Sequence, residues 1–260
     1  MTTIAITARS SLPLGACPQT FPPLGTRLPS NFGLCCIGTS ITVGTATTNS
    51  NAYRQKLWQA FQAAGLAPVF KGRNSDGAPP GSPWLLCEGV VGSTLPDHMI
   101  GGSADTVSWI AGLAPSARPD VLLHELGVND SSNAGLTAAF GSNMTTYTSQ
   151  LDSIQAGGFR HVWSVPPQRG DATLNANLNT ICATIISTVG TLRSGGTKVV
   201  YTDSRMLQLV QGFPGAHYER VGPTDIHPND DGALFMAAQI YAGILLGSGR
   251  QQTWIGDPNP

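Results

Sequence analysis

Charged side chains are scarce in this chain, since only 11% of its 260 residues are Asp, Glu, Lys or Arg, against about a quarter in an ordinary globular protein. The 14 Lys and Arg nearly balance the 15 Asp and Glu. The chain therefore lacks the basic surface of a protein that binds nucleic acid or an anionic membrane, and we expect neither partner. Ser, Thr, Asn and Gly fill the surface instead, which favours a secreted or particle-bound protein over a cytosolic one.

Long apolar runs are also missing. No window holds the roughly 18 consecutive apolar residues that a membrane-spanning helix needs. The segment 1–9 has neither the basic start nor the apolar stretch of a signal peptide, so a leader has been removed or the protein has none. We expect an extracellular or secreted protein that does not insert into a membrane.

Cysteine is sparse, and its spacing matches no zinc motif. The five cysteines are Cys17, Cys35, Cys36, Cys87 and Cys182. The odd number means that at least one thiol is free or pairs between chains, and the adjacent pair at 35 and 36 is predicted to be buried. The dipeptide His124-Glu125 does not extend to an HExxH motif, because Val128 stands at the second His position. We expect no metal site and no cofactor.

The length suits one compact α/β domain. Residues 1–32 are rich in Pro, Thr and Ser and predict an irregular N-terminal arm. The folded domain is predicted at residues 33–246, and a polar C-terminal tail at residues 247–260. No internal repeat and no second domain is visible.

Within the domain, short apolar runs alternate with helical patterns. Strands are predicted at 33–37, 67–70, 121–126, 161–165 and 198–202, and helices at 53–64, 136–154, 174–192 and 231–246. This alternation predicts βαβ units and a parallel sheet of about five strands, covered on both faces by helices. Ligands of such sheets bind at the carboxyl ends of the strands, and each motif described below follows a strand or lies in a loop on that side.

Two motifs lie where predicted strands end. The first, Gly38-Thr39-Ser40-Ile41-Thr42-Val43-Gly44, has small residues that would let the Ser40 side chain stand clear of the backbone. The second, Gly127-Val128-Asn129-Asp130, places an amide where it could donate to an oxyanion. The alternatives are a Ser/Thr turn that caps a helix and an Asx turn in which Asn129 and Asp130 bond their own backbone. A G-x-S-x-G elbow is absent, because Thr42 stands at the last Gly position.

Two further motifs lie in loops. Thr224-Asp225-Ile226-His227-Pro228-Asn229 puts a His beside a carboxylate near the C-terminus, in the chain order of many hydrolytic triads, although it could be a surface loop. In Glu88-Gly89-Val90-Val91-Gly92-Ser93-Thr94, a glycine could let a backbone N–H approach a reacting centre, or could be an ordinary loop glycine.

Taken in order, these four blocks resemble those of the SGNH (GDSL-like) hydrolases, and the Glu88–Thr94 block looks most similar to carbohydrate esterase family three. The resemblance spans residues 33–246. It implies a three-layer α/β/α, flavodoxin-like fold and an ester hydrolase. It further implies Ser40 as nucleophile, His227 as base and Asp225 as its orienting carboxylate, with an oxyanion hole made by Ser40, Gly92 and Asn129.

The sequence departs from that pattern at two positions. The family usually has Asp directly before the Ser, where this chain has Thr39. The family carboxylate normally lies three residues before the His, which is Thr224 here, whereas Asp225 lies two before it. Either the loop brings Asp225 to His227, or the enzyme uses a Ser-His dyad supported by a backbone carbonyl.

Two functions follow from these observations. The first is a serine esterase acting on short acyl esters, such as acetyl groups on a saccharide. The second is a non-catalytic carbohydrate-binding or virion structural module on a hydrolase-derived fold, which the low charge and the altered motifs would fit. The joint presence of Ser40, Asn129 and His227 favours the enzyme.

Overall fold

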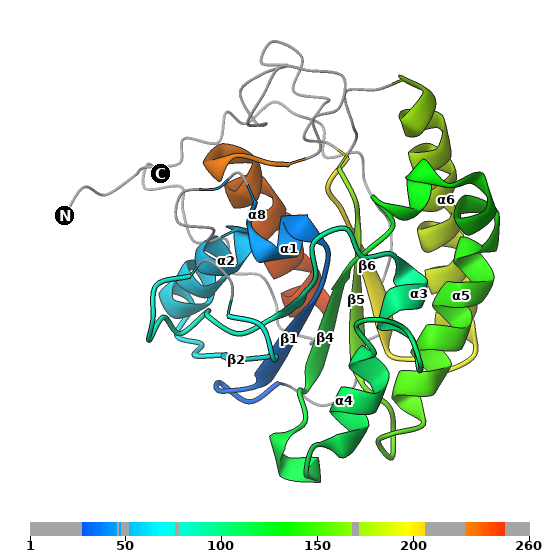
Figure 1. Cartoon of the computed structure of the whole chain (residues 1–260). Coiled ribbons are helices and arrows are strands. Elements are labelled where there is room, and N and C mark those ends of the chain that lie inside the picture. Colours follow the sequence, from blue (N-terminus) through cyan, green and yellow to red (C-terminus); the bar gives the residue numbers. More distant parts are fainter. Residues whose placement is uncertain are drawn as a thin grey trace.

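A parallel β-sheet forms the middle layer of the molecule (Figure 1). The computed structural model describes residues 28–45, 47, 52–75, 78–167, 172–205 and 227–247. The strands are β1 (Gly33–Gly38), β2 (Val69–Lys71), β3 (Glu88–Gly89), β4 (Val121–Glu125), β5 (Arg160–Val165) and β6 (Val199–Asp203). Their order is β2-β1-β4-β5-β6, with β3 pairing the end of β1, and all pairs are parallel. The predicted flavodoxin-like sheet is confirmed.

Helices cover both faces of this sheet, as the alternation predicted (Figure 1). One face carries α1 (Ser40–Val43), α2 (Ala52–Ala63) and α8 (Asp230–Gly247), and the other carries α5 (Ala134–Asp152) and α6 (Ala172–Ser194). The remaining helices are α3 (Leu95–His98), α4 (Thr106–Gly112), and the 3₁₀ turns η2 (Pro115–Ala117) and η3 (Asp130–Ser132). The molecule therefore has the three-layer α/β/α architecture expected from the sequence.

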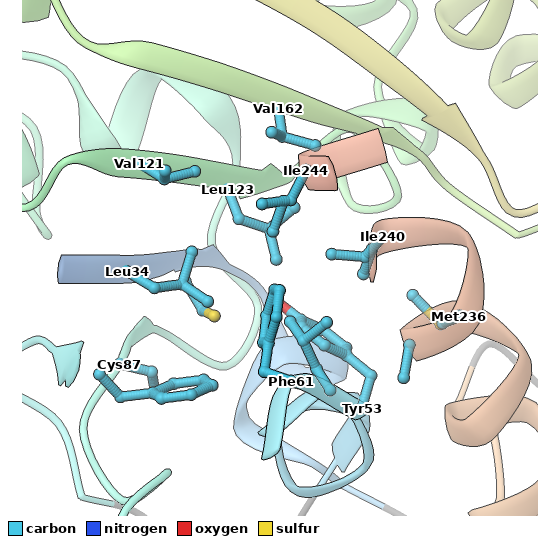
Figure 2. Packing of buried hydrophobic residues seen from close by; sticks show 14 of the residues in the cluster. Leu34, Tyr53, Phe61, Cys87, Val121, Leu123, Val162, Met236, Ile240 and Ile244 are labelled. Atoms are coloured by element: carbon cyan, nitrogen blue, oxygen red, sulfur yellow. The ribbon is translucent and has the colours of Figure 1, made fainter. Parts of the chain in front are cut away.

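The four long helices lie at the predicted helical patterns, and α2, α5 and α6 each bury an apolar stripe of side chains. In α2, Tyr53, Leu57 and Phe61 are fully buried, and the helix ends before Gly65, whose φ of 70° suits a glycine. Figure 2 shows Tyr53 and Phe61 packed with Met236, Ile240 and Ile244 of α8, beneath side chains of the sheet. On the other face, stripes of α5 and α6 pack together in a second cluster. Both stripes belong to the core, as expected.

The two faces of β1 divide between these clusters. Leu34 and Cys36 point toward α2 and α8, whereas Cys35 and Ile37 point toward α5 and α6. All four are buried, as is usual for an inner strand of a parallel sheet. The expectation that Cys35 and Cys36 are buried is confirmed, and both thiols are free. Cys17 lies outside the described residues.

The end of the predicted N-terminal arm packs against the domain. Leu28 and Phe32 are buried in the first core cluster, and the Phe32 ring meets the Phe61 ring edge-to-face at 5.4 Å between centroids. The segments 1–27 and 248–260 lie outside the described residues, so the proposed boundaries of arm and tail stay predictions. Within the described ranges, no helix is long and apolar enough to cross a membrane.

Candidate active site

Ser40 is the first residue of a one-turn helix that begins where β1 ends. Thr39 caps this helix, because its Oγ1 accepts a hydrogen bond of 3.3 Å from the backbone N–H of Ile41. Gly44 ends it with a φ of 100°, and its N–H donates to the Ser40 carbonyl at 2.9 Å. A side chain at Gly38 would overlap Thr42 and the Glu125 backbone. Capping is thus done by Thr39, which leaves the Ser40 hydroxyl for another partner.

That partner is His227, which precedes Pro228 just before α8. The His227 Nε2 atom lies 2.8 Å from the Ser40 Oγ atom, although 187 residues separate the two in sequence. Ser40 is 3% exposed, and His227 is half-buried. The fold therefore brings together the two residues that sequence reasoning named as nucleophile and base. Thr224, Asp225 and Ile226 of that loop lie outside the described residues, and the role expected of Asp225 stays a prediction.

Asn129 follows β4 and directs its side-chain amide at the neighbouring loop. Its Nδ2 donates to the Ser93 carbonyl at 2.9 Å, and the side chain makes no capping bond to the turn that follows. The Asx-turn alternative is therefore wrong for Asn129. An amide nitrogen carries two N–H groups, and no acceptor for the second one lies among the described residues. This second N–H is available to a ligand.

The Asp130 carboxyl accepts from backbone N–H groups of its own loop, those of Gly127 and Asp130, as the turn alternative expected, and it also reaches α3. Its two carboxyl oxygens accept from the Leu95 backbone N–H, at 3.0 and 3.3 Å. The bond ties the loop after β4 to the first turn of α3. Burial raises the pKa of Asp130 to about 6. Asp130 thus fixes the distance between the loops that carry Asn129 and Gly92.

Gly92 lies in a tight turn at the end of β3. The Val90 N–H donates to the Gly38 carbonyl at 2.9 Å, and the Ser93 N–H donates to the Val90 carbonyl at 3.1 Å. Gly92 has a φ of 78°, which this turn requires and which other residues adopt at a cost. Among the described residues, no group accepts from its N–H or from the first helical N–H, that of Ser40.

A second Ser-His pair, which sequence reasoning missed, supports this turn. The His98 Nε2 atom lies 3.0 Å from the Ser93 Oγ, and its Nδ1 lies 2.9 Å from the Thr106 Oγ1. The Ser93 hydroxyl donates to the Val90 carbonyl at 2.8 Å, so it is engaged within the turn. Burial lowers the pKa of His98 to about 4, which keeps the ring neutral. The available signal was the capping box Thr94-Leu95-Pro96-Asp97, which fixes the helix carrying His98.

Glu125 is the other polar residue that the motifs did not single out as part of the site. It is fully buried at the end of β4, and its Oε2 accepts from the Thr39 hydroxyl at 3.0 Å. Burial raises the pKa of this carboxyl to about 8, although hydrogen bonds from Thr39 and Thr42 oppose the shift. No sequence motif includes Glu125 as a site residue. The only signal in the sequence is that an acidic residue stands within the apolar run 121–126.

Metal ligation has no basis in the described part of the chain. There, no group of three or more His, Cys, Asp or Glu side chains could hold an ion. The described part of the candidate site brings together the hydroxyl of Ser40 and the imidazole of His227, and the oxyanion-hole role expected of Ser40, Gly92 and Asn129 stays a prediction.

Comparison with known proteins extends this description. No family model and no curated protein matches the sequence. Among solved structures, a family 3 carbohydrate esterase of Clostridium thermocellum is 20% identical, covers 85% of this chain and 100% of its own, and superimposes with a TM-score of 0.66. A carbohydrate esterase family 3 protein of Talaromyces cellulolyticus is 22% identical, covers 81% and 95%, and has a TM-score of 0.62.

A third structure belongs to the lipolytic G-D-S-L family of Veillonella parvula, with 13% identity, coverage of 80% and 94%, and a TM-score of 0.55. Identities this low establish the fold alone. The chain has an SGNH hydrolase-like fold, as its four sequence blocks implied.

Proposed function

We propose that this protein is a serine esterase, with Ser40 as nucleophile and His227 as general base. The observation that carries the proposal is the 2.8 Å contact between the Ser40 Oγ and the His227 Nε2, at the carboxyl edge of a parallel sheet, where such folds bind their ligands. A nucleophile within hydrogen-bonding reach of its base is the arrangement that acyl transfer needs. The described neighbours in fold include proteins named as carbohydrate esterases.

The reaction would proceed in two halves. As the Ser40 oxygen attacks the ester carbonyl, its proton passes to the His227 Nε2, and the alcohol leaves with that proton. Water then attacks the acyl-Ser40 ester and gives a proton to His227. His227 passes this proton to the Ser40 oxygen as the carboxylic acid leaves. Through both halves, the N–H groups of Ser40, Gly92 and Asn129 would stabilise the oxyanion.

The proposed substrate is a small acyl ester, in particular an acetyl group on a saccharide. Support comes from the neighbours in fold, which include an acetyl esterase and two family 3 carbohydrate esterases. The apolar stripes of the helices are buried in the core, so they leave no long apolar run to bind a long acyl chain. Acetate esters should therefore outrun octanoate esters in kcat/KM, and a preference for long chains would point to a lipase. A secreted location stays a prediction from the low charge.

Hydrolysis of an aryl acetate, together with labelling by a fluorophosphonate probe, tests the proposal. The wild-type protein should hydrolyse the ester and take up one label, and Ser40→Ala should abolish both. Ser142→Ala is a matched control, because this exposed serine on α5 donates only to the Ala139 carbonyl of its own helix. Labelling that survives in Ser40→Ala would mean that another serine is the nucleophile. A wild-type protein without either activity would favour the binding or structural module.

A further inference from the structure

The carboxyl group of Glu125 lies directly against the turn that carries Ser40. Glu125 pairs with Gly38 in the register of β4 with β1, so its side chain stands beside the two residues that precede the nucleophile. The side chain is fully buried. It lies on the α2 and α8 side of the sheet, where the Thr42 hydroxyl bridges it to the Tyr53 side chain.

Hydrogen bonds connect Glu125 to both sides of Ser40 in sequence. The Glu125 Oε2 accepts from the Thr39 Oγ1 at 3.0 Å and from the Thr42 Oγ1 at 3.4 Å. Thr42 also lies 3.0 Å from the Tyr53 hydroxyl. One carboxyl oxygen thereby holds the residue before Ser40, which caps α1, and a residue one half-turn after it. A shift of this carboxyl would move the whole helical turn.

The second carboxyl oxygen is unusual because it is buried and has no hydrogen-bond partner among the described residues. No cation of the described ranges forms an ion pair with Glu125. Glu88 provides the contrast, since its carboxylate accepts from the Arg73 guanidinium at 2.6 and 3.0 Å. A buried carboxyl with neither a cation nor a full set of donors is favoured in its neutral, protonated form.

We propose that Glu125 is a positioning residue of the Ser40 turn, acting on the nucleophile through the Thr39 and Thr42 hydroxyl groups in its uncharged state. This inference rests on the proposed function. Ionisation of Glu125 would place an uncompensated negative charge beneath the first N–H of α1. That charge opposes the oxyanion that this N–H is proposed to stabilise, and it changes the hydrogen bonds on both sides of Ser40. Turnover therefore falls as Glu125 loses its proton.

Two other ionisable groups beside this network, Cys36 and Tyr53, have pKa values held above this range. Cys36 on β1 is buried, which raises its pKa to about 12, and burial holds the pKa of Tyr53 on α2 well above its usual value. The Arg54 guanidinium on α2 donates to the carbonyls of Trp84, Leu85 and Val43 and makes no ion pair with Glu125. His227 contacts Ser40 itself. Cys36 and Tyr53 therefore do not account for an event near pH 8 at Ser40, and a Glu125→Gln variant separates Glu125, whose pKa is about 8, from His227.

Backbone amide resonances of Ser40 and Ile41, followed by NMR from pH 6 to 10, test this coupling without any need for activity. The wild-type resonances should shift with a midpoint near 8, and Glu125→Gln, which keeps the shape and the acceptor oxygen, should remove that shift. Asp152→Asn is the matched control, because Asp152 bonds His161 on the opposite face, and it should keep the shift. In parallel, wild-type kcat should fall about tenfold between pH 7 and 9, and kcat of Glu125→Gln should not.

Thr42→Val serves as a second variant, since it cuts one of the two links and leaves the carboxyl in place. It should reduce the size of the Ser40 shift and lower kcat with little change in KM. The inference is wrong if Glu125→Gln keeps the shift. It is also wrong if the wild-type protein hydrolyses the ester normally while the Ser40 and Ile41 amide resonances do not depend on Glu125. If the shift depends on Glu125 but the wild-type protein hydrolyses no ester, the positioning stands and the proposed function has failed.

Discussion

The side-chain amide of Asn129 has two N–H groups, and only one of them has an acceptor among the described residues. One holds Ser93, and the other is proposed to meet the oxyanion, which carries full charge only in the transition state. We expect Asn129→Ala to lower kcat by roughly 10²–10³, with little change in KM. Steady-state kinetics on an aryl acetate measures both.

Asn133→Ala is the control for that change. Asn133 caps α5 by accepting from the N–H groups of Gly135 and Leu136 at 2.8 and 3.1 Å, so its loss should cost about 1 kcal/mol of stability and leave kcat unchanged. Equal kcat losses in both variants would show that Asn129 acts through stability alone.

The second prediction at this scale concerns the carboxylate expected to orient His227. A base that accepts the Ser40 proton must hold one tautomer, and a carboxylate on the other ring nitrogen provides this. We expect Asp225→Asn to cut kcat by about 10⁴, Thr224→Val to change it little, and His227→Ala to abolish turnover. Substantial kcat in Asp225→Asn beside an inactive His227→Ala would indicate a dyad with a different partner for the imidazole.

Single residues were predictable from sequence where they belong to a motif. Ser40 and His227 were named from short patterns, and the fold brings them within 2.8 Å. Glu125 and His98 were not named as part of the site, because their positions depend on strand register and on loop packing. Glu125 faces Thr39 only because β1 and β4 pair Gly38 with Glu125, and no sequence pattern reports that register.

At the scale of secondary-structure elements, the close packing of α8 against β6 can be tested by substitution. At Gly243 of α8, a Cβ atom would overlap the Thr202 side chain of β6, whereas at Gly190 of α6 a Cβ would meet nothing within 4 Å. We expect Gly243→Ala to destabilise the protein by about 1–3 kcal/mol. Gly190→Ala, its matched control, should stabilise it by up to about 1 kcal/mol. Denaturant unfolding measures both, and a neutral Gly243→Ala would mean that Thr202 moves aside at no cost.

Elements were predictable in proportion to their length. The four long helices and five of the strands lie where apolar periodicity put them, with ends shifted by one or two residues. The β3 residues were placed in a loop, and α3 and α4 were not predicted, because two to seven residues do not complete enough periods to show a pattern. These short elements position Gly92 and His98. Sequence periodicity therefore predicts the scaffold better than it predicts the loops of the site.

At the scale of the whole molecule, stability should fall as pH rises from about 6.5 to 8. Glu125 has its pKa raised from 4.5 to about 8, so the stability it contributes is full below 4.5 and is lost as pH rises through 8. Asp130 acts in the same direction only up to about 6. The buried His98, with its pKa lowered from 6.5 to about 4, loses stability in the opposite direction, as pH falls below 6.5.

Between 6.5 and 8, Glu125 is therefore the main contributor among these groups, with a slope of up to about 1.4 kcal/mol per pH unit. Denaturant unfolding at pH 6.5, 7 and 8 should show this fall in the wild-type protein and a flatter profile in Glu125→Gln. An unchanged profile in that variant would assign the slope to other groups. The low proportion of charged residues makes such a single-group effect easier to see.

The sequence separation of 187 positions between Ser40 and His227 also sets an order of events during synthesis on the ribosome. At about 5–20 residues per second, the base is made roughly 10–40 seconds after the nucleophile. In that interval β1, β4 and the loops around Ser40 and Asn129 can begin to assemble. The imidazole arrives only with α8, which packs against α2. Ester cleavage by a nascent chain would thus report the docking of α8 and not the formation of the sheet.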